Sequence, residues 1–283
     1  TGAPGAGKST LVNALATHLL SQNLKVSIIA VDPTSPFSGG AVSVNRIRMK
    51  DNFQAKNLFI RSMANRGQLG GLAQTTKDVI QVLDAFGSDI IIVETVGVGQ
   101  SEIDIFKSAY TTIVISVPGM GDDIQAIKAG IMEITDIFVV NKADLPKADK
   151  TVAEIEAMLD LSERIDINHQ HHSIKIIRTE GWRPPVIKTI AFRGDNIKQL
   201  ADLIQKHKEH IKKTGILEQK LRIRNRHYVA EILKYILSKN IERMVFTNPD
   251  IEKRIEKILT VDKNFDPYSI SEEILKEFLV RYL

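Results

Sequence analysis

Short apolar runs alternate with segments of helical periodicity through the first two thirds of the chain. The runs predict strands at Val26–Val31, Leu58–Ile60, Ile90–Val93, Ile113–Val117, Ile137–Val140 and Val186–Ile190. Helical spacing predicts a helix from about Ser9 and further helical segments at Leu72–Phe86, Ile103–Lys107, Ile124–Glu133 and Val152–Leu159. Several runs are apolar on both faces, which is typical of central strands covered by helices. The alternation predicts an α/β fold with a doubly wound, mostly parallel sheet.

The pattern changes after about Lys213, where only helical stretches follow. They are expected at Leu217–Lys239, Pro249–Leu259 and Ser271–Tyr282. We therefore interpret residues 1–213 as a nucleotide-type domain and residues 214–283 as an all-helical C-terminal arm. The first arm helix carries an apolar stripe formed by Leu221, Val229, Ile232, Leu233, Ile236 and Leu237. This stripe favours dimerisation, and packing on the parent domain is the alternative.

The amino-acid composition excludes several classes of protein function. The 283 residues are 43% hydrophobic and 25% charged, as in ordinary globular proteins. The absence of cysteine excludes a disulfide scaffold, a thiolate zinc site, an iron–sulfur cluster and a cysteine nucleophile. A net charge of +4 is too small and too evenly mixed to indicate a nucleic-acid partner. No apolar run is long enough to span a membrane, so no membrane partner is expected.

A glycine-rich loop opens the chain. The segment Gly2-Ala3-Pro4-Gly5-Ala6-Gly7-Lys8-Ser9 fits G-x-x-x-x-G-K-[ST] at every fixed position. In such a loop backbone N–H groups surround phosphate oxygens, the lysine reaches the β- and γ-phosphates, and the serine hydroxyl binds Mg²⁺. The candidate nucleotide ligands are Gly2, Ala3, Gly5, Ala6, Gly7, Lys8, Ser9 and Thr10. A flexible turn before an ordinary helix is the alternative. Because such loops follow a buried strand, we expect a strand to precede Thr1 in the full protein.

A second motif indicates which base is bound. Asn141-Lys142-Ala143-Asp144 follows the run Ile137–Val140 directly and matches N-K-x-D, the guanine-reading element of GTPases. Asp144 can accept two hydrogen bonds from guanine, while the Lys142 stem lies over the ring. Two charge-assisted bonds of about 1.5–3 kcal/mol each would favour GTP over ATP by roughly 10² to 10⁴. Ala191 is expected to make a backbone contact to guanine O6. A polar loop that caps a helix is the alternative.

Two carboxylates lie at strand ends near the phosphate loop. Glu94 ends one run in Glu94-Thr95-Val96-Gly97, where GTPases normally carry Asp-x-x-Gly, and Asp32 ends another. Gly97 is expected to sense the γ-phosphate through its N–H. Paired carboxylates beside phosphates favour a Mg²⁺ shell over general acid and base, and simple strand-end caps are the alternative.

Together these segments resemble the methylmalonyl-CoA-mutase-associated GTPases, the MeaB/ArgK group of P-loop GTPases. The matching segments are Thr1–Leu11, Val31–Gly40, Val93–Glu102, Val117–Asp144 and the tail that ends in Asp266-Pro267-Tyr268. The resemblance implies a homodimeric GTPase of low intrinsic turnover. It also implies a chaperone that gates adenosylcobalamin loading and protection of a cobalamin-dependent acyl-CoA mutase.

The resemblance also assigns roles to residues. It implies GTP or GDP with Mg²⁺ as cofactors, and Lys8, Asp32, Glu94 and Lys128 as the candidate catalytic residues. Its third switch matches Gly119–Lys128, so Asp122 and Lys128 are candidates for coupling to the mutase. The candidate metal ligands are Ser9, Asp32, Asn45 and Glu94. Asn45 stands where the family usually has an aspartate, and we expect this change to weaken Mg²⁺ binding or hydrolysis. Gln100 is a candidate for orienting water.

Other interpretations have less support from the sequence. A nickel-type metal-insertion GTPase would use Cys or His ligands near the switches, but the histidines at His169–His172 favour a solvated loop. A P-loop small-molecule kinase leaves Asn141–Asp144 unexplained. The stretch Lys206–Arg226 has eight basic residues against two acidic ones and favours a solvated helix face over an acidic partner. The composition suits a bacterial cytoplasm.

Overall fold

The computed structural model describes most of the first 247 residues and scattered positions after them. The described residues are 1–32, 56–64, 74–95, 109–119, 135–166 and 181–247, and then 249, 251–253, 256, 266, 268–269, 271–272 and 275–276. They divide into two units, Thr1–His227 and Tyr228–Leu283. The predicted phosphate loop and the strands belong to the first unit.

Six parallel strands are described in the first unit. They are β1 (Val26–Asp32), β2 (Leu58–Ala64), β3 (Ile90–Glu94), β4 (Ile113–Ser116), β5 (Ile137–Val140) and β6 (Val186–Lys188). One sheet has the order β2-β1-β3 and the other β4-β5-β6, and all neighbouring strands are parallel. Parallel neighbours need crossover connections, so their carboxyl ends share one edge.

The first two residues lie between the ends of the two sheets. Ile115 of β4 donates its N–H to the carbonyl of Thr1 at 2.8 Å, and Gly2 forms an isolated parallel bridge with Ile115. On the other side, the Thr95 hydroxyl, directly after β3, donates to the Thr1 hydroxyl at 3.1 Å. The start of the phosphate loop is therefore fixed at the strand edge where β3 and β4 end.

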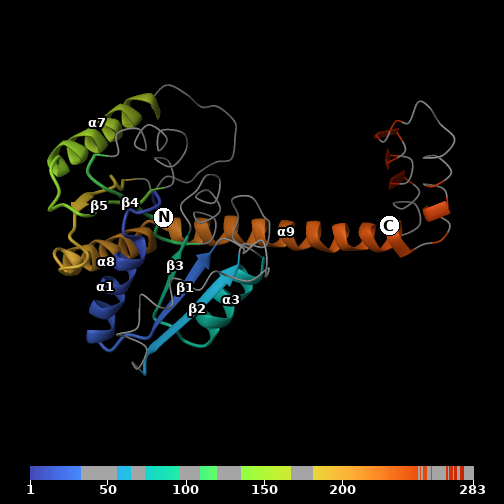
Figure 1. Ribbon diagram of the computed structural model, residues 1–283, viewed down its shortest axis with the longest axis horizontal. Helices are drawn as coiled ribbons and strands as arrows, with labels where there is room; N and C mark the ends of the chain where they lie inside the picture. The colour runs from blue at the N-terminus through green and yellow to red at the C-terminus, as the bar shows by residue number, and fades with distance from the viewer. Residues whose placement is uncertain are drawn as a thin grey trace. The chain divides into compact units, whose positions relative to one another are not determined.

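Helices cover both faces of the sheets (Figure 1). The helices are α1 (Lys8–Ser21), α3 (Gln74–Ala85), α7 (Ala148–Asp166), α8 (Ile197–Lys213) and α9 (Ile216–Thr247). Because side chains alternate along a strand, Ile137 and Val139 of β5 pack in the core that holds α1 and α8. Phe138 and Val140 pack instead with α7 residues. Ile29 of β1 packs with α3 on the face away from α1.

This arrangement confirms the predicted fold class. All six predicted strands are present, and β5 has the predicted bounds. Strand β6 ends two residues earlier than predicted, because Ile190 exchanges hydrogen bonds with Asp195 and closes a tight turn there. The predicted helix at Val152–Leu159 is longer and runs over the whole of α7. The predicted segments Ile103–Lys107 and Ile124–Glu133 lie outside the described residues.

The sequence analysis predicts helix α8 only in part, because a helix face is expected over Lys206–Arg226 but no helix over residues 197–205. Its buried positions Ile197 and Leu200 lie near its start, and Leu200 is completely buried in the core with α1. The second half of the helix has Ile211 as its single aliphatic residue among lysines, histidines and a glutamate. The buried positions Ile197, Leu200, His207 and Ile211 recur at helical spacing along one face of the helix, so the periodicity that would predict its first half is present in the sequence.

Within the second unit, α9 continues to Thr247 and the described positions beyond it are mostly helical. This agrees with the helical character predicted for the arm. None of the helices in the described part of the chain combines the length and apolarity needed to cross a membrane.

Candidate functional site

The phosphate loop encloses its own lysine. Lys8 is buried, and its ammonium group donates to the carbonyls of Gly2 at 2.8 Å and Ala3 at 3.1 Å. A side chain at Gly2 would put Cβ 2.1 Å from the carbonyl oxygen of Ile115, so only glycine allows the loop to lie against β4. The loop therefore holds a positive charge at the carboxyl edge of the strands, where α/β proteins of this type bind ligands.

The end of β3 contacts the loop from a second direction. The Ser9 hydroxyl donates to Glu94 Oε1 at 2.5 Å, and Glu94 is buried. The neighbouring Thr95 reaches Thr1 as described above. A hydroxyl and a carboxylate oxygen in contact are the oxygen donors that Mg²⁺ prefers. The predicted pair Ser9 and Glu94 thus fits a magnesium site.

Asn141 connects three segments through one side-chain amide. Its Nδ2 donates to the carbonyl of Ala6 in the phosphate loop at 2.9 Å. Its Oδ1 accepts from the Thr189 hydroxyl and from the N–H of Ala191, each at 3.1 Å. Asn141 is only 2% exposed. The first residue of the N-K-x-D motif therefore joins the phosphate loop to the loop after β6.

Close approach to Asn141 explains why residue 7 is glycine. Gly7 has a φ of +86°, and a Cβ there would lie 2.4 Å from Asn141 Nδ2. It would also lie 4.0 Å from Cε of Lys142, so the lysine stem passes near the phosphate loop. Lys142 itself has a φ of 56°, which turns the motif sharply after β5.

The rest of the motif lies on the same turn. Ala143 donates its N–H to the carbonyl of Thr189 at 3.1 Å, which ties the motif to the end of β6 a second time. Asp144 is exposed. The N–H of Ala191, the donor that a guanine O6 contact would use, donates to Asn141 in this structure. The exposed carboxylate of Asp144 is therefore a better candidate than the N–H of Ala191 for recognising the base.

Several predicted site residues lie outside this description. Asn45, Gly97, Lys128, Asp122 and Gln100 fall outside the described residues, as does the histidine cluster His169–His172. Asp32 is placed at the end of β1, with only its backbone described. Thr10 is exposed in the first turn of α1. The structure thus brings together Gly2, Ala3, Ala6, Gly7, Lys8, Ser9, Glu94, Asn141, Lys142 and Ala191.

A buried charged cluster at the opposite edge was missed in the sequence. Asp136, directly before β5, lies 3.1 Å from Nε2 of His207 and 3.3 Å from Nζ of Lys220. Burial raises the pKa of Asp136, but the hydrogen bond from His207 and the charge of Lys220 lower it more, and the net pKa is below its usual value. Lys220 lies 84 residues away along the chain, so no local pattern connects the two.

The comparisons agree with these motifs. The family model for the methylmalonyl-CoA mutase-associated GTPase MeaB matches residues 1–248. A protein of Pyrococcus abyssi is 46% identical over 279 residues, which cover 99% of this chain and 82% of the relative. The GTPase ArgK of Escherichia coli is 33% identical over 267 residues, covering 93% and 76%. The mouse mitochondrial methylmalonic aciduria type A homolog is 31% identical over 289 residues, covering 100% and 65%.

Solved structures show the same fold. The crystal structure of a LAO/AO transport system kinase is similar with a TM-score of 0.60 at 26% identity, covering 99% of this chain and 80% of that one. HypB from Helicobacter pylori, solved in complex with nickel, has a TM-score of 0.50 at 17% identity, covering 74% and 85%. At that identity the likeness to HypB concerns the fold alone.

Replacing Gly7 by alanine tests the contact between the phosphate loop and Asn141. The added Cβ would force Asn141 away from Ala6, and an unmade hydrogen bond to a buried polar group costs about 1–3 kcal/mol. We expect Gly7→Ala to weaken GDP binding roughly 10- to 100-fold, measured by calorimetry.

The matched control is Gly215→Ala. Gly215 has a similar φ of +73°, but nothing lies within 4 Å of an added Cβ. This variant should lose about 1–2 kcal/mol of folding free energy from the left-handed backbone alone and keep its GDP affinity. Unchanged GDP affinity in Gly7→Ala would contradict the contact's role.

Proposed function

The chain belongs to the family of methylmalonyl-CoA mutase-associated GTPases, and on this basis we propose that it is the GTP-dependent chaperone of a cobalamin-dependent acyl-CoA mutase. GTP hydrolysis is the activity of the family. The finer role, which is to gate adenosylcobalamin loading and to protect the mutase from inactivation, is our proposal. The observation that carries the GTP-dependent part is the hydrogen-bonded connection from Asn141 to Ala6, which joins a guanine-type motif to a phosphate loop.

Each motif has a distinct task in nucleotide binding. Lys8, now held by the carbonyls of its own loop, would neutralise phosphate charge, and the N-terminus of α1 adds its positive end. Asp144 would accept the two guanine donors that adenine lacks in that arrangement. The Lys142 stem would cover the ring. Asn141 would position both loops without itself taking part in the hydrolysis.

Mg²⁺ is part of the proposal. Ser9 and Glu94 are already in contact and would hold the ion, with Asp32 and Asn45 as the further candidates from the sequence. When bound, the ion would neutralise charge on the phosphate oxygens during hydrolysis. In the structure, Glu94 accepts a hydrogen bond from the Ser9 hydroxyl and so fixes it in the first turn of α1.

The geometry of this site suits control of GTP hydrolysis by a protein partner. The proposed switches are residues 94–102 and 117–128, and both begin at described strand ends that contact the phosphate loop, at β3 and β4. The motifs supply no side chain assigned as a general base, and we propose that the intrinsic rate is therefore slow and rises when the mutase binds. Asp122 and Lys128 remain the proposed coupling residues.

Hydrolysis with and without a mutase tests this function. The purified protein should hydrolyse GTP slowly, and the rate should rise when a cobalamin-dependent acyl-CoA mutase is added. Phosphate release is the measurement, with ATP as the control nucleotide. A rate that is the same with methylmalonyl-CoA and isobutyryl-CoA mutases as without them would contradict the chaperone role and leave the GTPase standing.

We also propose that the helical arm forms a homodimer. On α9, Val229 is 55% exposed, Leu233 54%, Ile236 47% and Leu237 49%. Large apolar side chains at this spacing lie on one helix stripe, and continuous exposed apolar surface marks interaction sites. A second copy is the occupant we favour, because the resemblance that identified the family implies a homodimer.

Charges placed in this stripe should separate the copies. We expect the native protein to have twice its chain mass of 31.6 kDa by light scattering, and Leu233→Asp with Ile236→Asp to have the mass of one chain. The control is Val82→Asp on α3, which is more exposed, at 66%, and lies outside the arm. A monomeric native protein, or a double variant that stays dimeric, would contradict the assignment.

A further inference from the structure

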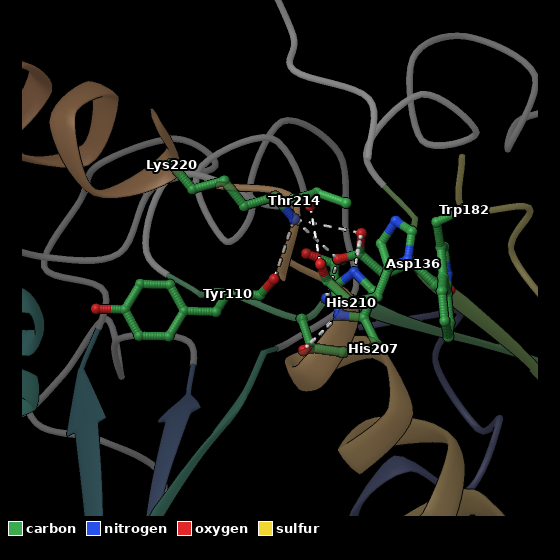
Figure 2. Close-up of polar contacts among 9 residues, drawn as sticks. Tyr110, Asp136, Trp182, His207, His210, Thr214 and Lys220 are labelled. Carbon is green, nitrogen blue, oxygen red and sulfur yellow. Dashed lines mark hydrogen bonds and ion pairs between the residues drawn. The ribbon is translucent and has the colours of Figure 1, made fainter. Parts of the chain in front are cut away.

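The side chains around Asp136 connect two helices, α8 and α9, to one short segment before β4 (Figure 2). Asp136 is 5% exposed, His207 fully buried and Lys220 8% exposed. Lys220 of α9 contacts both carboxylate oxygens, at 3.3 and 3.4 Å, and His207 of α8 lies at 3.1 Å. Trp182 donates its indole N–H to the backbone carbonyl of Asp136 at 2.9 Å and covers His207 edge-on. We call Asp136, His207 and Lys220 the basal cluster.

Three consecutive residues before β4 each contact the basal cluster. Lys220 donates to the carbonyl of Tyr110 at 3.0 Å. The Thr111 hydroxyl lies 2.8 Å from His207 Nδ1, and the N–H of Thr112 donates to Asp136 at 2.7 Å. A second α9 residue, Arg224, donates to the Tyr110 hydroxyl at 2.7 Å and stacks over its ring at 5.0 Å. The first turns of α9 are thereby fixed to the start of β4.

The buried charges disfavour partial detachment of α9. A carboxylate out of water is costly unless its counterion stays in place. If α9 moved away slightly, Asp136 would lose Lys220 before water could replace it. Partial displacement of the first turns of α9 would therefore leave the buried carboxylate without its ammonium group, which disfavours intermediate positions.

Both strands that start at the basal cluster end at the nucleotide loop. Asp136 directly precedes β5, and Asn141, the residue that donates to the phosphate loop, directly follows it. Thr112 precedes β4, in which Ile115 pairs with Thr1 and Gly2 at the start of that loop. Each strand is four residues long, about 13 Å at the usual rise. Strands β4 and β5 therefore connect the two edges directly.

We propose that the basal cluster is a latch that couples the nucleotide loop to the docking of α9. The latch rests on the proposed guanine-nucleotide site. A nucleotide that fixes the phosphate loop and Asn141 also fixes β4 and β5. It thereby fixes Asp136 and the carbonyl of Tyr110, to which Lys220 donates. Lys220 and Arg224 are positioning residues in this scheme, because they act through Asp136 and Tyr110 and touch no nucleotide. The helix they hold is the one that continues into the second unit.

Amide hydrogen exchange on α9 tests the latch. In the native protein, saturating GDP should slow exchange of the amides at 218–226 by about fivefold, a typical coupling between sites. In the double variant Asp136→Asn with Lys220→Met this nucleotide effect should disappear. Removing both charges together leaves neither the carboxylate of Asp136 nor the ammonium of Lys220 buried without the other, so the variant should keep its fold, as checked by its circular dichroism and melting.

Two further variants complete the test. Lys208→Met removes an exposed lysine next to His207 and should keep the full nucleotide effect. Arg224→Gln lies at the partly exposed end of the contact, leaves the buried charges in place and should reduce the effect about twofold. By linkage, GDP should also bind the double variant about fivefold more weakly than the native protein.

The outcomes separate the latch from the proposed function. If GDP binds the native protein but leaves exchange at 218–226 unchanged, or slows it equally in Arg224→Gln and the native protein, the latch is wrong and the nucleotide site stands. If GDP does not bind at all, the proposed function fails and the latch fails with it. A merely structural cluster would raise basal exchange in the variants without removing the difference made by GDP.

Discussion

One buried amide organises the nucleotide site. The side chain of Asn141 makes three hydrogen bonds, one donated to the phosphate loop and two accepted from Thr189 and Ala191, just after β6. A buried amide with several good partners can hold these segments in only one arrangement, because each unmade bond would leave a polar group unpaired. Gly7 is glycine for the same reason, since any side chain there would meet Asn141. The loops that carry phosphate and base recognition are thus one connected structure.

The parallel strand topology determines which residues lie near the Asn141 side chain. Parallel strands bring Glu94, the residues after β4 and Asn141 to a single edge, where Ser9 and Glu94 already contact one another. The same strands bring Thr112 and Asp136 to the opposite edge, where α8 and α9 attach. A polar site at one edge and an ionic cluster at the other are therefore consequences of one topology. The proposed coupling between them uses only these short strands.

Motifs with fixed local spacing could be predicted from the sequence, and contacts across the chain could not. The phosphate loop and N-K-x-D each lie next to a strand or helix whose apolar pattern is clear, so their place at the strand edge followed from the fold class. The bond from Asn141 to Ala6 spans 135 residues and the pair of Lys220 with Asp136 spans 84, and no local pattern signals either. The basic second half of helix α8 is predicted as a solvated helix face, whereas its first half is not predicted although its buried residues recur at helical spacing. Lys220 was grouped with a solvated basic stretch, although its ammonium is buried.

Calorimetric titration of GDP against ADP tests the central claim, that Asn141 and Asp144 build a guanine site onto the phosphate loop. The native protein should bind GDP more tightly than ADP by roughly 10² to 10⁴, the discrimination expected from two charge-assisted hydrogen bonds. Asp144→Asn should lose most of this preference while keeping the fold, because Asp144 is exposed. Equal affinity for the two nucleotides in the native protein, or a preference for GDP that survives in Asp144→Asn, would contradict the account.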